Sequence, residues 1–108
     1  MADLYKELGN LIVETIDDEW KKVVIKITSS MNKMCIFDCL YSDNSENIKK
    51  FTFDKMKGFL MGKNVFELQE SMSPEHKWNK AVYTLEKNGH FDMTFEWDQT
   101  LQDEWDNA

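Results

Sequence analysis

The sequence contains no arginine: all 13 basic residues are lysines, and 20 acidic residues outnumber them to give a net charge of −7. Proteins that bind nucleic acids by neutralising phosphates need basic patches on their surface. This composition therefore argues against direct nucleic-acid binding of that kind. It favours a basic protein as the binding partner.

Long apolar runs are also missing. No stretch approaches the roughly 18 apolar residues of a membrane span, and the first residues, MADLYKEL, lack the basic start and apolar centre of a signal peptide. The two cysteines, Cys35 and Cys39, lie four positions apart, which on a strand is about 13 Å and too far for a disulfide. We therefore expect a cytoplasmic protein with free thiols and no membrane contact.

Sequence signatures of catalysis are absent: there is no Gly-rich phosphate loop, HExxH, CxxC or GxSxG. Cys35 and Cys39 could join His76 and His90 at a zinc ion, but both cysteines fall in a strand-like run, which favours core thiols. His90 is better interpreted as an exposed turn residue than as a base acting beside Asp92. The sequence thus predicts a protein that is not an enzyme and carries no cofactor or metal.

Hydrophobic periodicity predicts one α+β domain over residues 1–108, with a mostly antiparallel sheet of four to five strands and helices packed on one face. The glycines at 58 and 62 and Asn64 are poor helix formers, which leaves open whether residues 54–72 form one helix or two. The expected elements are a helix over 3–16, strands over 22–28, 34–41 and 49–53, a turn over 29–33, a helix over 54–72, a hairpin over 80–98, and a short helix or acidic tail over 99–108.

The same periodicity assigns side chains to the core. The positions expected to face it are Leu4, Tyr5, Leu8, Leu11, Ile12 and Ile16 in the first helix and Val23, Ile25, Ile27, Cys35, Phe37, Cys39, Tyr41, Phe51 and Phe53 in the strands. In the second helix the apolar residues have roughly helical spacing: Met56, Phe59, Leu60, Val65, Phe66 and Met72.

The hairpin sequence KAVYTLEKNGHFDMTFEWD dominates the pattern. Asn88-Gly89 tolerates the positive φ angles of a tight turn. Beyond it the residues alternate strictly, so we expect Phe91, Phe95 and Trp97 to be buried. The opposite face, with Asp92, Thr94, Glu96 and Asp98, is expected to be exposed.

Acidic residues gather at both ends of the chain, while residues 21–63 hold nine lysines and four acids. If the two ends meet on one side of the fold, they form one negative surface. A solvated strand face and an acid–base carboxylate pair are the alternatives; tryptophan among carboxylates favours partner binding, with Trp105 as an anchor. The candidate partner-binding residues are Asp92, Glu96, Asp98, Asp103, Glu104, Trp105 and Asp106, with Asp17, Asp18 and Glu19.

Two segments carry a resemblance to a known family. LGNLIVETIDDEWKKVVI is a helix followed by an acidic turn and tryptophan, and WNKAVYTLEKNGHFDMTFEWD is a tryptophan, strand, glycine turn and acidic aromatic strand. In both, the chain resembles the YezG-like bacterial immunity proteins, antitoxins of polymorphic toxin systems.

The resemblance implies a cytoplasmic protein without enzymatic activity that binds and inhibits a cognate toxin, commonly a nuclease, in contact-dependent competition. An acidic surface suits this role because a nuclease must be basic where it meets phosphates. A second role remains open from the residues alone, that of a small adaptor or regulatory subunit that binds another basic protein.

Overall fold

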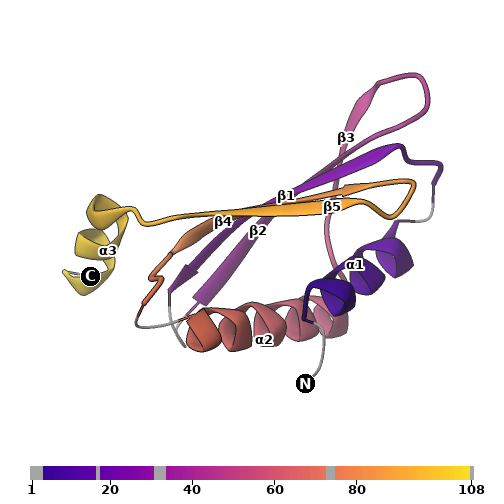
Figure 1. The fold of residues 1–108 in the computed structure, drawn as a ribbon. Helices are drawn as coiled ribbons and strands as arrows, with labels where there is room; N and C mark the ends of the chain where they lie inside the picture. Colours follow the sequence, from indigo (N-terminus) through magenta and orange to yellow (C-terminus); the bar gives the residue numbers. More distant parts are fainter. Residues whose placement is uncertain (1–3, 17, 31–33, 73–74, 108) are drawn as a thin grey trace.

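The computed structural model describes residues 4–16, 18–30, 34–72 and 75–107, and it confirms the α+β class. The five strands form one antiparallel sheet in the order β3-β2-β1-β4-β5. Helices α1 and α2 lie along one face of this sheet, and α3 stands beyond its end (Figure 1). The elements are α1 (Leu4–Thr15), β1 (Lys22–Ser30), β2 (Met34–Ser42), β3 (Ile48–Phe51), α2 (Lys55–Met72), β4 (Lys80–Glu86), β5 (Phe91–Glu96) and α3 (Gln99–Asp106).

The core lies between the sheet and the α1–α2 pair. The alternation predicted for the first strand is confirmed, because Val23, Ile25 and Ile27 are buried. Full burial of such side chains stabilises the fold by about 1.5–3 kcal/mol each. The other buried apolar residues are Leu8, Ile12, Ile16, Trp20, Cys39, Tyr41, Met61, Val65, Leu68, Trp78, Ala81, Tyr83 and Leu85.

Helix α2 is a single helix, which answers the question that the sequence left open. It is continuous through Gly62, because packing of Met61, Val65 and Leu68 against the core outweighs weak helix propensity. Those three residues follow the i, i+4, i+7 spacing of one face. At 100° per residue, Met56 and Phe59 fall on the opposite side. Both are exposed, as is Leu60 to a lesser extent, so the roughly helical spacing of the apolar residues did not identify the buried face.

The hairpin forms as predicted, and Gly89 has a φ of +91° that other residues rarely adopt. Its turn is closed by hydrogen bonds from Gly89 N to Glu86 O at 2.9 Å and from Glu86 N to His90 O at 2.8 Å. The predicted face of β5 is also correct, because Phe95 lies opposite buried Ala81 and packs on Trp78, although Phe95 is half-buried and not buried as expected. Phe91, however, is 42% exposed, because β5 is an edge strand; it stacks on Tyr83 at the rim of the core.

Element boundaries account for the remaining differences. Ser29 and Ser30 continue β1 and are buried, so they do not belong to the turn predicted over 29–33; residues 31–33 lie outside the described part. β3 ends at Phe51, and Phe53 follows it as a half-buried residue. Asp54 caps α2 by accepting a hydrogen bond from Lys57 N at 2.8 Å. Across the described ranges, no helix has the length and apolar character needed to cross a membrane.

The two cysteines lie on the core-facing side of β2, with Cys39 buried and Cys35 half-buried, and neither forms a disulfide. Burial raises the pKa of both thiols from 9.0 to about 12. Because thiolate is the reactive form, we expect the folded protein at about pH 8 to react with a disulfide reagent about a thousandfold more slowly than exposed thiols. Stopped-flow labelling of native and urea-unfolded protein checks this; equal rates, or a non-reduced mass lower by two hydrogens, would contradict it.

Candidate partner-binding surface

The sheet register separates the two acidic groups of the sequence. At one end of the sheet, Lys22 lies opposite Ser42 and Glu86; at the other, Lys80 lies between Thr28 and Glu96. Residues 18–19 precede β1 at the first end, whereas residues 98–106 follow β5 at the second (Figure 1). The two groups therefore do not join into one negative surface; Asp17 is outside the described residues.

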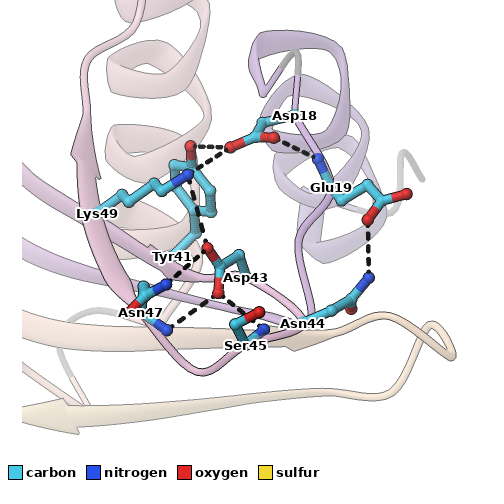
Figure 2. Close-up of polar contacts among 8 residues, drawn as sticks. All are labelled: Asp18, Glu19, Tyr41, Asp43, Asn44, Ser45, Asn47 and Lys49. Atoms are coloured by element: carbon cyan, nitrogen blue, oxygen red, sulfur yellow. Dashed lines mark hydrogen bonds and ion pairs between the residues drawn. The ribbon is translucent and has the colours of Figure 1, made fainter.

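Asp18 belongs to a polar network around the β2–β3 connection (Figure 2). Its Oδ2 accepts hydrogen bonds from the Tyr41 hydroxyl at 2.8 Å and from Lys49 Nζ at 3.1 Å. Lys49 also lies 3.6 Å from Asp43, and Glu19 accepts a hydrogen bond from Asn44 at 3.0 Å. The negative charge of Asp18 is thus paired with a lysine within the fold, and the network holds the connection in place.

Hydrogen bonds from Tyr41 and Lys49 lower the pKa of Asp18 below its ordinary 3.8. The ionised carboxylate therefore contributes stability above about pH 4, and this contribution is lost as pH falls through the lowered pKa. We expect Asp18→Asn to be less stable than wild type near neutral pH, with the difference shrinking in acid. Urea unfolding of both proteins from about pH 7 to about pH 2.5 measures this; a constant difference across that range would contradict it.

Asp98 holds the start of α3, and the prediction that it is exposed was wrong. Its side chain accepts a hydrogen bond from Leu101 N at 3.1 Å, as an N-cap residue does, and pairs with Lys80 at 2.9 Å. The bond from Lys80 is the main cause that lowers the pKa of Asp98. The Asp98 carboxylate is therefore already bonded to groups within the fold.

Asn79 fixes the position of this cap. It is 1% exposed; its Nδ2 donates to Asp98 O, and its Oδ1 accepts from Asp98 N, both at 2.8 Å. Its backbone N–H donates to Glu96 O at 3.1 Å, and its carbonyl accepts from Ser29 N at 2.9 Å. Asn79 thus ties α3 to the ends of β5 and β1. This role was not predictable from the sequence, because no spacing pattern distinguishes this asparagine from one in an ordinary loop.

Helix α3 presents exposed negative charge. Asp103, Glu104 and Asp106 are exposed in its C-terminal half, which has no basic residue in the last turn. The helix macrodipole disfavours acids at this end, so helix stability does not explain them. We refer to Glu96, Asp103, Glu104 and Asp106, which are all exposed, as the C-terminal acidic surface.

The two carboxylates on β5 lie on the uncovered face of the sheet. Asp92 is opposite Thr84, nearer the hairpin turn, and Glu96 is opposite Lys80, at the end next to α3. Both are exposed, as predicted. Glu96 therefore adjoins the acids of α3, whereas Asp92 stands apart from them.

Two tryptophans accompany the C-terminal acidic surface. Trp97 was assigned to the core, but β5 ends at Glu96 and the chain turns into α3, which leaves Trp97 41% exposed. Its Nε1 donates to Gln99 Oε1 at 3.0 Å. Trp105, the predicted anchor, is half-buried on α3. Large indoles beside charge are typical of energetically important contact residues.

The described residues contain no group of three or more His, Cys, Asp or Glu side chains placed to hold a metal ion. The arrangement at the α3 end of the sheet is instead an exposed acidic helix with indoles beside it. Such an arrangement can attract positively charged groups by charge complementarity.

No family model matches the sequence. The chain is similar to a Bacillus subtilis (strain 168) protein named Immunity protein YezG, with 25% identity over 121 residues. The alignment covers 98% of this chain and 79% of that protein. The similarity extends over both segments quoted above and supports a relationship to immunity proteins.

Proposed function

We propose that this protein is an immunity protein of the cytoplasm that binds and inhibits a cognate toxin. The observation that carries the proposal is the similarity to a named immunity protein over nearly the whole chain. The fold supports a binding role, since the exposed carboxylates of α3 lie beside Trp97 and Trp105 at one end of the sheet.

The proposed toxin is a basic nuclease domain, and the C-terminal acidic surface is its contact. A nuclease carries positive potential where it holds phosphates, and an acidic protein is attracted to that site. Asp103, Glu104 and Asp106 are exposed and form no ion pair among the described residues, so their charge remains available to a partner. Complementary charge of this kind accelerates association and disfavours wrong partners.

Co-expression tests the proposal. A toxin domain sought among the genes next to that of this protein is induced in a bacterial host with and without this protein, and a catalytically inactive toxin serves as the control for expression burden. We expect growth arrest by the active toxin alone and restored growth when both proteins are present. Arrest that persists although both proteins accumulate would contradict the proposal, and complex formation without rescue would favour the adaptor role.

A further inference from the structure

A pocket of about 410 Å³ lies where α3 approaches the end of β1 and the segment before β4. This volume falls within the ~300–1,000 Å³ of pockets that take ligands. Three of the four tryptophans, Trp78, Trp97 and Trp105, line it together with Gln99 and Gln102. The pocket adjoins the C-terminal acidic surface, because α3 supplies residues to both.

The indoles are held in place around this pocket. Trp78 is 2% exposed and packs on Phe95 with ring centroids 5.0 Å apart. Trp97 is 41% exposed, yet its hydrogen bond to Gln99 at 3.0 Å restrains its ring. A restrained, partly exposed indole loses little conformational entropy when a partner covers it, which makes it an efficient anchor.

Two carboxylates lie directly behind the glutamines that line the pocket. Gln99 Nε2 donates to Asp103 Oδ1 at 2.9 Å, and Gln102 Nε2 donates to Asp106 Oδ1 at 3.0 Å. Each carboxylate is therefore within one hydrogen bond of a pocket-lining amide. The Oε1 of Gln102 has no hydrogen-bond partner in the described part of the chain, which leaves it available as an acceptor. Lys77 also lines the pocket, and its side chain is exposed. Its positive charge is opposite in sign to that of these carboxylates.

Trp78 supplies a second unsatisfied group. Its Nε1 is buried and has no hydrogen-bond partner among the residues the structure describes. A buried donor left without an acceptor destabilises a protein. Because this nitrogen has no exposed surface, an oxygen of an occupant reaches it only if the indole of Trp78 moves.

We propose that this pocket receives an arginine side chain of the protein partner; the inference rests on the proposed function and deepens it. A guanidinium stacks on aromatic rings, is weakly hydrated and donates five hydrogen bonds. The indoles of Trp97 and Trp105 provide the rings, and Gln102 Oε1 provides an acceptor in the lining. The carboxylates of Asp103 and Asp106, one hydrogen bond behind the lining, provide negative charge that attracts the guanidinium.

The first test needs no toxin. The ¹⁵N-labelled protein is titrated with N-acetyl-arginine amide, with the neutral isostere N-acetyl-citrulline amide and with N-acetyl-glutamate amide. We expect the indole N–H signals of Trp97 and Trp105 to shift with arginine, in about the millimolar range for so small a ligand, while Trp20 at the other end does not. No shift, an equal response to citrulline or a stronger response to glutamate overturns the inference.

The second test uses the toxin domain of the co-expression experiment. Trp97→Ala and Trp105→Ala are expected to weaken toxin binding by about 30-fold each, as truncation of anchor residues does. Phe59→Ala, which removes an exposed aromatic residue from α2, is the matched control and should bind as wild type. Thermal unfolding of each variant separates lost binding from lost folding.

The outcomes of the two tests are distinguishable. If wild type inhibits the toxin and both tryptophan variants bind as tightly as wild type, the inference fails and the proposed function stands. If wild type does not bind the toxin, the proposed function fails and the amide titration alone decides whether the pocket selects arginine.

Discussion

Reversing the charge of Asp103, Glu104 and Asp106 to lysine should slow association with the toxin about 10- to 100-fold at low salt and flatten the salt dependence of the rate. Complementary charge raises association rates, and this contribution is screened within about 10 Å at 0.1 M salt. Asp98 is left unchanged because it caps α3. Stopped-flow association rates over a series of salt concentrations provide the measurement.

The same variant should fold as well as wild type. All three positions are exposed, and lysine near the C-terminal end of a helix suits the macrodipole better than an acid. Glu14, Glu67 and Glu70 are also exposed, on α1 and α2, and their reversal to lysine changes the net charge equally. This control triple should associate nearly as fast as wild type. If both triples slow association to the same extent, net charge and not the α3 end is responsible.

Replacing Asn79 by alanine should destabilise the protein by about 2–3 kcal/mol and loosen α3. The change removes two hydrogen bonds to the backbone of Asp98 and leaves that N–H and carbonyl without their buried partner. Since Asn79 ties the start of α3 to β1 and β5, the acids and indoles of α3 should lose their fixed positions. Toxin binding should therefore weaken by more than the loss of folded protein explains.

Urea unfolding and amide hydrogen exchange across α3 measure the two effects of Asn79→Ala. Asn10 is exposed on α1, so Asn10→Ala is the matched control and should leave both nearly unchanged, because alanine favours helix. Faster exchange in α3 with an unchanged sheet is the expected result. An Asn79→Ala protein with wild-type stability and wild-type exchange in α3 would show that the hydrogen bonds of Asn79 do not hold the helix in place.

Periodicity was sufficient for the elements with one clearly apolar face. Val23, Ile25 and Ile27 in β1 and the face of β2 with Cys39 and Tyr41 were predicted correctly, because a sheet covered on one side enforces period two. The hairpin was predictable because Asn88-Gly89 marks its turn. The local residue pattern of the strands was therefore enough to predict most of the sheet.

Tertiary geometry decided what local pattern could not. Trp97 continues the alternation of β5, yet the strand ends before it because Asn79, distant in sequence, fixes the next residue as a helix cap. The apolar surface of α2 is spread around the helix, and only packing selected Met61 over Phe59 for the core. Likewise, the composition placed acids at both ends of the chain, but the antiparallel register separated Asp18 from Asp103.

A titration of toxin nuclease activity with this protein tests the central claim most directly. At toxin concentrations well above the dissociation constant, an immunity protein is predicted to reduce activity linearly and to abolish it at one molar equivalent. The Asp103, Glu104 and Asp106 reversal should need a clear excess to reach the same inhibition. Full nuclease activity at a large molar excess of the wild-type protein would contradict the account, as would complete inactivation by substoichiometric amounts, which is the behaviour of an enzyme.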